Sequence, residues 1–221
     1  MRFFFSWPLG VSDLANNMHR YVQAMERQIE VLVQKQHAIT QTATSEVEHD
    51  MQYMLLGEME ETFPRNLRYG TLVTIYATVE QSIRSACYLT GEVVGGPFTE
   101  PKRGGMLEGA AAYLARTLGV QIIKDRITWT PVKALRTLRH CIAHTAGHVP
   151  SATHPERVRC AMRAFTFDLM EGSDGYLEIP REALPSILDA ARGWLDEVVS
   201  ECWREFVTRG GLEERGGVAI N

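Results

Sequence analysis

The sequence predicts an all-α fold: a helical bundle with a long N-terminal helix and one small β-hairpin before the C-terminal helix. Apolar residues recur at spacings of three and four along most of the chain, which is the period of an amphipathic helix. Residues that favour the start or the end of a helix frame several of these segments. Alternation of apolar and polar residues, which indicates a strand, is confined to residues 165–179. Strands are therefore not expected to form the core.

The N-terminal part of the chain is predicted to form one long amphipathic helix. Ser12 and Asp13 are suited to cap its start, and an apolar stripe follows at helical spacing: Leu14, Met18, Tyr21, Val22, Met25, Ile29, Leu32 and Val33. We expect the helix to bend in the polar stretch 40–46 and to end near Glu61, before Pro64. The aromatic residues that precede Ser12 are expected to form an arm that packs on the domain or on a partner.

The central segments carry the same kind of signal. Residues 66–90 repeat apolar side chains at helical spacing, and Gly91 is suited to close this helix. The stretch 91–105 is rich in Gly and Pro and is expected to be a loop. A short, Ala-rich helix is predicted over residues 105–119.

The helix predicted over residues 131–145 has clear start and end signals. Thr130 is a good N-cap, Pro131 follows in the first turn, and Gly147 can adopt the left-handed conformation that ends helices. Farther along, two alternating runs flank a Gly-Ser-Asp-Gly turn, which is typical of a hairpin. A final amphipathic helix is predicted over residues 181–208.

The composition is that of an ordinary globular protein. The chain has 221 residues, of which 45% are hydrophobic and 23% are charged, so it can bury a core without disulfides or metals. Cys87, Cys141, Cys160 and Cys202 stand far apart, which favours buried thiols in a reducing compartment. No stretch approaches the roughly 18 apolar residues of a membrane span, and no cleavage site of a secretory signal follows the first residues. We expect a cytoplasmic protein that needs no metal and no cofactor.

These signals divide the chain into three parts. We expect residues 1–64 to form the arm and the long amphipathic helix, residues 65–209 the main helical domain, and residues 210–221 a flexible tail.

The stretch TPVKALRTLRHCIAHTAGH, residues 130–148, combines arginines and histidines on one predicted helix. No Asp or Glu occurs between Arg126 and Pro155, although the whole chain has a net charge of −4. We expect the basic residues of this segment to form an electropositive face. Such a face is suited to the phosphate groups of a nucleic acid.

Histidine and arginine at the end of this helix are suited to one kind of chemistry. His140 and His144 are one turn apart on the same face, and the long side chain of Arg139 can approach them where the helix ends. Cleavage of RNA by its own 2′-hydroxyl requires a proton acceptor or donor and a cation for the charge that develops on the phosphate. One histidine and one arginine supply both without a metal.

The sequence RHCIAH, Arg139 to His144, resembles the R-x4-H signature of HEPN domains. In these domains a polar residue, often Asn and sometimes Asp or His, follows the arginine, and His140 occupies that position. The continuation HTAG is similar to the Gly-containing turn of the family. The resemblance extends to the upstream segment LVTIYATVEQSIRSAC and to the ending with a hairpin and then a helix, as in the RiboL-PSP-like branch, and it covers roughly residues 65–209.

This resemblance implies a homodimeric or pseudo-dimeric bundle in which two motifs face each other and form a metal-independent endoribonuclease site. Arg139 would stabilise the phosphate, His144 would be the acid or base, and His140 would orient one of them. Glu80 matches the acidic residue that some members place on the preceding helix. The residues expected to bind RNA are Arg126, Lys133 and Arg136. Many members are toxins or antiviral-defence components, so an antitoxin or other defence protein is an expected partner.

One position departs from the family, and several residues are expected to be structural. The subgroup that nucleotidyltransferase antitoxins regulate has a Tyr two residues after the histidine, where this chain has Ala146. Regulation by modification of that Tyr is therefore not expected. The side chains expected to pack in the interior are those of Tyr69, Tyr76, Trp129 and Cys141.

Three other interpretations of the basic segment stay open. It could be a solvated surface helix without a specific function. His140 and His144 have the spacing of helical zinc ligands, with His148 nearby, although the arginines would repel a cation. Finally, the domain could be a HEPN-type interaction module that binds RNA, a nucleotide or a protein without cutting RNA.

Overall fold

The computed structural model describes residues 2–101, 105–120, 129–165 and 169–208, with side chains from Asn16 onward. Within these ranges the chain is all-α apart from one two-stranded hairpin, so the predicted fold class is confirmed. The elements follow in the order α1 (Arg2–Thr40), α2 (Glu46–Gly57), a π turn (Glu58–Thr62), α3 (Phe63–Val94), α4 (Met106–Leu118), α5 (Trp129–Thr145), a 3₁₀ turn (Val149–Ser151), α6 (Pro155–Met162), β1 (Met170–Glu171), β2 (Leu177–Glu178) and α7 (Ala183–Thr208).

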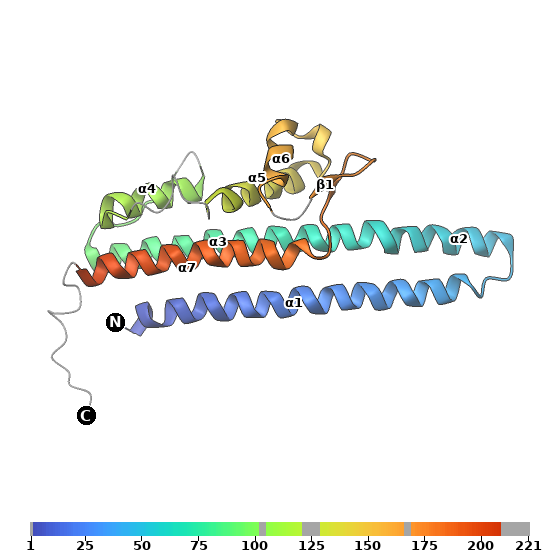
Figure 1. Cartoon of the computed structure of the whole chain (residues 1–221), viewed down its shortest axis with the longest axis horizontal. Helices are drawn as coiled ribbons and strands as arrows, with labels where there is room; N and C mark the ends of the chain where they lie inside the picture. The colour runs from blue at the N-terminus through green and yellow to red at the C-terminus, as the bar shows by residue number, and fades with distance from the viewer. Residues whose placement is uncertain (1, 102–104, 121–128, 166–168, 209–221) are drawn as a thin grey trace, which may run out of the picture.

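The helices form a layered bundle in which α3 and α7 make the middle layer (Figure 1). Helix α1 runs along one side of this layer, and α4 and α5 pack on the other side. Helix α6 packs against α5, close to the antiparallel pair β1–β2. Helix α2 folds back on α1, and the end of α1 projects with α2 beyond the rest of the molecule as a helical hairpin (Figure 1).

The core is centred on α3 and α7, whose apolar positions recur at helical spacing. Leu72, Ile75 and Ile83 of α3 and Trp194 of α7 are each at most 1% exposed. Each aliphatic side chain buried to this extent contributes about 1.5–3 kcal/mol to stability. The apolar stripe predicted for residues 66–90 is confirmed, since all its members are buried: Leu72, Ile75, Tyr76, Val79, Ile83, Ala86 and Cys87.

Helix α1 begins at Arg2 and not at Ser12, so the N-terminal residues extend the helix instead of forming a separate arm. Ser and Asp in a helix interior cost less than about 1 kcal/mol relative to Ala, so a capping residue does not force a helix to start there. No helix in the described ranges combines the length and the apolar character needed to cross a membrane.

Helix α1 ends at Thr40, where the sequence predicts a bend, and the chain becomes helical again at Glu46, the first residue of α2. Ser45 caps α2 by accepting a hydrogen bond from the backbone N–H of Glu48 at 3.2 Å. The Glu48 carboxylate accepts in turn from the backbone N–H of Thr44 at 3.1 Å. These contacts satisfy N–H groups that the first turn of a helix leaves unpaired.

Pro64 does not end a helix, contrary to the prediction, because the chain is helical without interruption from Glu46 to Val94. A proline ring in a regular α-helix collides with the carbonyl four residues earlier. Here the turn just before Pro64 is a π-helix, in which the N–H of Phe63 bonds to the carbonyl of Glu58. The wider turn accommodates the proline. The predicted domain boundary at residue 64 therefore lies inside one helical run.

The helix predicted to close at Gly91 continues to Val94, and Gly95 with φ 79° is its C-cap. Gly91 has a packing role instead. A Cβ atom there would lie 3.0 Å from the Tyr113 hydroxyl and 3.1 Å from the Gly96 carbonyl oxygen. The Tyr113 hydroxyl donates to that same carbonyl at 2.7 Å, which fixes α4 against the end of α3.

The predictions for the second half of the chain are confirmed for α4, α5, the hairpin and α7, each within a few residues. Helix α6 is missing from the sequence-based prediction. It spans eight residues and buries Val158, Ala161 and Met162. So short a helix shows too few apolar repeats for the pattern to be recognised.

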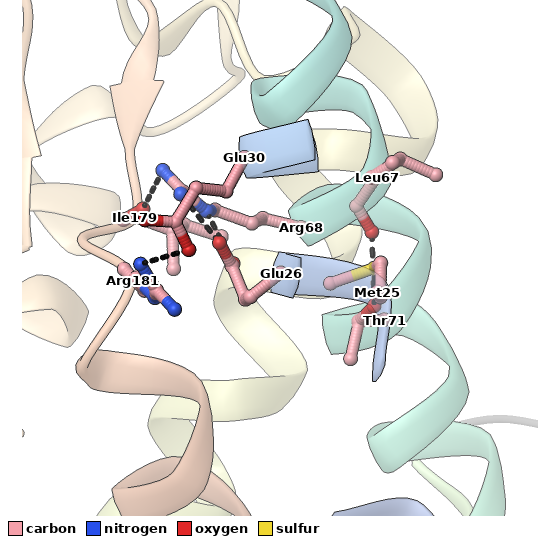
Figure 2. A network of polar contacts seen from close by, with 8 residues as sticks. All are labelled: Met25, Glu26, Glu30, Leu67, Arg68, Thr71, Ile179 and Arg181. Carbon is pink, nitrogen blue, oxygen red and sulfur yellow. Dashed lines mark hydrogen bonds and ion pairs between the residues drawn. The ribbon is translucent and has the colours of Figure 1, made fainter. Parts of the chain in front are cut away.

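A buried ion pair connects α1 to α3 and to the segment before α7 (Figure 2). Arg68 donates through Nε and Nη2 to the two carboxylate oxygens of Glu26, at 2.7 and 2.9 Å. Its Nη1 also donates to the carbonyl of Ile179 at 3.3 Å. Glu26 is only 4% exposed, so its charge depends on this bidentate partner. Beside it, the Arg181 guanidinium lies 3.6 Å from the Glu30 carboxylate at the surface.

Replacement of Arg68 by Ala is expected to lower the free energy of unfolding by about 3 kcal/mol, because it leaves the Glu26 carboxylate buried without a partner. The matched control is Glu30→Ala, which removes the exposed pair with Arg181 and should cost less than about 1 kcal/mol. Urea denaturation of the wild type and both variants measures the two losses. Equal losses would contradict the role given to the buried pair.

Candidate active site

Helix α5 presents most of the predicted site residues on the side that faces away from the core. Its buried positions follow helical spacing: Val132, Ala134, Leu135, Leu138 and Cys141. Lys133, His140 and His144 are exposed on the remaining surface, and Arg136 and Arg139 are half-buried. Packing of the apolar stripe thus determines the direction of the basic side chains. The prediction that Cys141 is buried is confirmed, since it is 2% exposed.

His140 and His144 lie against each other at the end of α5. Their ring centroids are 4.2 Å apart and the ring planes are tilted by 50°. Partial desolvation, together with the positive charges of His144, Arg139 and Arg136, lowers the pKa of His140 from its usual value. His140 is therefore mostly neutral near pH 7, and its ring can accept a proton or orient a neighbouring group.

Arg139 points toward α3, where its guanidinium carbon lies 6.0 Å from the centroid of the Tyr76 ring. Across the described part of the chain it forms no ion pair with a carboxylate and no hydrogen bond to either histidine. Arg139 and His144 are thus on one helix end but are not in direct contact. The guanidinium keeps its donors available for another group.

Glu80 also lies on α3, one turn beyond Tyr76. The Tyr76 hydroxyl donates to Oε1 of Glu80 at 3.0 Å. Burial and the adjacent Glu80 carboxylate raise the pKa of Tyr76 well above its usual range, so the hydroxyl remains a donor. Tyr76 therefore lies between Glu80, to which it donates a hydrogen bond, and the guanidinium of Arg139. Its side chain is buried, as predicted.

Arg136 has a carboxylate partner that the local sequence does not reveal. It forms an ion pair with Glu108 of α4. The segment from Arg126 to Pro155 lacks carboxylates, yet the fold supplies one from another helix. The positive charge available to a ligand is smaller than the sequence suggests. Lys133 is exposed, and Arg126 lies outside the described residues.

The chain turns sharply after His144 and is fixed there by the hairpin. Ala146 and Gly147 have φ angles of 51° and 84°. The Gly147 carbonyl accepts from the N–H of Leu177 at 2.9 Å, and the Leu177 carbonyl accepts from the Tyr69 hydroxyl at 2.6 Å. A Cβ atom on Gly147 would lie 2.3 Å from that hydroxyl oxygen. Glycine is therefore required at this position by conformation and by space.

His148 belongs to the structural contacts of the hairpin. Its Nδ1 is 2.7 Å from the Ser151 hydroxyl, and its ring packs edge-on against Tyr176 at 5.1 Å. Within the described ranges, no group of three or more His, Cys, Asp or Glu residues could hold a metal ion. His148 thus does not complete a zinc site with His140 and His144.

Sequence reasoning did not identify the contacts of Tyr76 and Glu108 with the site residues. Tyr76 precedes Glu80 by one helical turn, so this hydrogen bond could have been inferred from the spacing alone. The pairing of Glu108 with Arg136 depends on how α4 and α5 pack, and no local pattern indicates it. Trp129 packs on the buried Trp194 at 5.6 Å, which confirms its predicted structural role.

Comparison with known proteins gives no match: no protein-family model, no curated protein and no solved structure matches this chain. The similarity to HEPN domains remains a prediction. It depends on residues 139–144 and on their position at the end of α5.

Replacement of Gly147 by Ala is expected to lower the free energy of unfolding by about 2 kcal/mol or more, because the new methyl group meets Tyr69 in a left-handed conformation. The control is Gly193→Ala in α7, where nothing lies within 4 Å of the added Cβ. That variant should be more stable than the wild type by up to about 1 kcal/mol. Chemical denaturation measures both changes, and a neutral Gly147→Ala would disagree with this geometry.

The lowered pKa of His140 predicts a pH dependence of stability with a defined sign. The folded chain binds this proton less tightly than the unfolded chain, so protonation favours unfolding. The cost is absent well above about pH 6.5 and appears as the pH falls below that value. The free energy of unfolding of the wild type should therefore fall more between about pH 7.5 and 5.5 than that of His140→Gln. Parallel pH curves for the two proteins would refute this.

Proposed function

We propose that this protein is a metal-independent endoribonuclease of HEPN type. The observation that carries the proposal is the exposed pair His140–His144 at the end of α5, next to an Arg139 that has no carboxylate partner in the described ranges. Imidazoles can move protons near neutral pH, and an unpaired guanidinium can bind a phosphate through two donors. The similarity of residues 139–144 to the HEPN signature supports the same activity.

The proposed reaction uses the 2′-hydroxyl of the RNA as the nucleophile. A base removes the 2′ proton, the 2′ oxygen bonds to the adjacent phosphorus, and the bond from phosphorus to the 5′ oxygen breaks. An acid donates a proton to that leaving oxygen. The products are a 2′,3′-cyclic phosphate and a 5′-hydroxyl, and no metal or cofactor takes part. His144 is the base or the acid, and Arg139 stabilises the charge on the phosphate.

His140 and Glu80 have supporting roles in this proposal. His140 contacts the ring of His144 and is mostly neutral, so it orients the His144 imidazole without adding a full charge. Glu80 fixes the Tyr76 hydroxyl, and Arg139 lies near the Tyr76 ring. Both residues act through a neighbour and are positioning residues.

RNA would approach along the exposed side of α5. Lys133 is exposed two turns before His140, and it is the basic residue best suited to a flanking phosphate. Arg136 would have to share its charge with Glu108. Arg126 remains a proposed RNA-binding residue from the sequence alone.

Arg139 and His144 do not touch within one chain, which fits a site composed by two copies. A homodimer in which two α5 ends face each other would bring the Arg139 of one copy near the His144 of the other. The cytoplasmic location, the role in a toxin–antitoxin or antiviral-defence system and an antitoxin or defence partner are proposed from the resemblance to HEPN proteins.

The purified protein is expected to cleave single-stranded RNA in EDTA and to leave 2′,3′-cyclic phosphate ends. His144→Ala and Arg139→Ala should each reduce the cleavage rate by about 10²–10⁴-fold, because each removes a group that acts in the transition state. A panel of labelled RNAs, analysed by gel electrophoresis and by end-group mass spectrometry, measures both the rate and the ends.

The matched controls are His154→Ala and Arg163→Ala, exposed residues outside α5 that should leave the rate unchanged. Full activity of His144→Ala, or cleavage only after a divalent metal is added, would contradict the mechanism. Tight binding of RNA by the wild type without any cleavage would instead support an interaction module of HEPN type.

A further inference from the structure

Two arginines are neighbours on α5, and a carboxylate from another helix holds one of them. Arg136 and Arg139 are three residues apart, so their side chains leave adjacent positions on the helix surface. Arg139 forms no ion pair with a carboxylate in the described ranges. Arg136, in contrast, donates from Nη1 to Oε1 of Glu108 on α4. The fold thus brings two guanidinium groups to one side of α5 and neutralises one of them.

The ion pair of Arg136 and Glu108 lies against the backbone at the start of α4. Gly105 is the N-cap of this helix, and Glu108 belongs to its first turn. A Cβ atom on Gly105 would collide with the Glu108 carboxylate and with the Arg136 guanidinium. The glycine therefore leaves the space in which the two charged groups meet.

This ion pair can open at little cost. The side chains of Arg136 and Glu108 are 38% and 44% exposed, so water screens their attraction. The buried pair of Glu26 and Arg68 differs in this respect, since its carboxylate depends on its partner. A Glu108 carboxylate that leaves Arg136 remains in the first turn of α4, where the helix dipole favours a negative charge. Another anion can therefore replace Glu108 at Arg136.

The pair is also close to the proposed active site. Partial desolvation lowers the pKa of His140, and the charge of Arg136 is among the neighbouring charges that lower it further. On α3, the ring of Tyr76 lies 6.0 Å from the guanidinium carbon of Arg139. The charges of Arg136 and Glu108 act on the hydroxyl of the same tyrosine. A guanidinium released by Glu108 would thus add its charge to the side of α5 that carries Arg139.

We propose that Glu108 competes with a phosphate of the RNA for Arg136. In the free protein the Glu108 carboxylate occupies the guanidinium, and RNA that binds along α5 has to displace it. Glu108 therefore lowers the affinity for RNA and limits the number of phosphates that α5 binds. This inference rests on the proposed binding of RNA along α5.

The experiment measures RNA binding by the full-length protein and by three variants: Glu108→Gln, Arg136→Gln and the double variant. The probe is a labelled single-stranded RNA with methylated 2′-oxygens, which cannot supply the nucleophile and stays intact. Fluorescence anisotropy at several salt concentrations gives the dissociation constants. All four proteins are checked for folding by circular dichroism.

Glu108→Gln is expected to lower the dissociation constant by about two- to fivefold, which is the equilibrium equivalent of an exposed ion pair. It should also steepen the dependence of log Kd on log salt by about 0.7, because one more phosphate is neutralised without releasing a carboxylate. Arg136→Gln should weaken binding, since Glu108 then repels the RNA. The double variant replaces an ion pair by two neutral amides and should bind like the wild type.

The matched control is Glu46→Gln, the same chemical change at an exposed residue of the projecting α1–α2 hairpin, which should keep the wild-type affinity (Figure 1). A Glu108→Gln variant that binds no more tightly than the wild type would overturn the inference. The same holds if the double variant keeps the gain, because the effect would then not pass through Arg136. Equal losses in both single variants would show that the pair only fastens α4 to α5.

The outcomes for the proposed function are separate. If neither the wild type nor any variant binds RNA, the proposed function fails and this inference fails with it. Tighter binding by Glu108→Gln, reversed in the double variant, supports the competition even if unmodified RNA is never cleaved. In that case only the nuclease activity is contradicted.

Discussion

Two consecutive residues of α3, Arg68 and Tyr69, fix the positions of the neighbouring elements relative to α3. Arg68 bonds to the buried Glu26 of α1 and to the Ile179 carbonyl before α7. Tyr69 points to another side and bonds to the Leu177 carbonyl of the hairpin. Successive side chains of a helix diverge by about 100°, so two neighbours can reach two different layers. Helix α3 is therefore the element against which α1, the hairpin and α7 are all positioned.

The same arrangement positions the end of α5. The hairpin strand that accepts from Tyr69 also donates to the carbonyl of Gly147, three residues after His144. Two turns farther along α3, Tyr76 lies near the Arg139 guanidinium and bonds to Glu80. The direction of the histidines and of Arg139 consequently depends on α3 through two separate contacts. Within the described ranges, the side chains of Arg139, His140 and His144 form no hydrogen bond and no ion pair, so they are available to the external phosphate that we propose as their ligand.

The helices could be predicted because their apolar periods are long and their end signals are local, as for Pro131 and Gly147 of α5, although α5 already includes Trp129 and Thr130 is therefore not its N-cap. The failures have physical causes. Pro64 does not end the helix because the wider π turn before it accommodates its ring. Gly91 is not the C-cap of α3; it allows α4 to pack closely against the end of this helix. The motif residues were found from their spacing, but the pairing of Arg136 with Glu108 depends on tertiary packing. For that reason the charge of the site was overestimated from the sequence.

The π turn before Pro64 also changes which way α2 faces. In a regular α-helix, Met54 and Leu72 would be about five full turns apart and would point in the same direction. Val47 and Met51 would follow nearly the same line as the buried stripe of α3. The π turn Glu58–Thr62 winds fewer degrees per residue, which rotates α2 by roughly 90° relative to α3. This phase shift divides one continuous apolar pattern into two parts: the α3 part is buried in the core, and Val47, Met51 and Met54 of α2 are exposed.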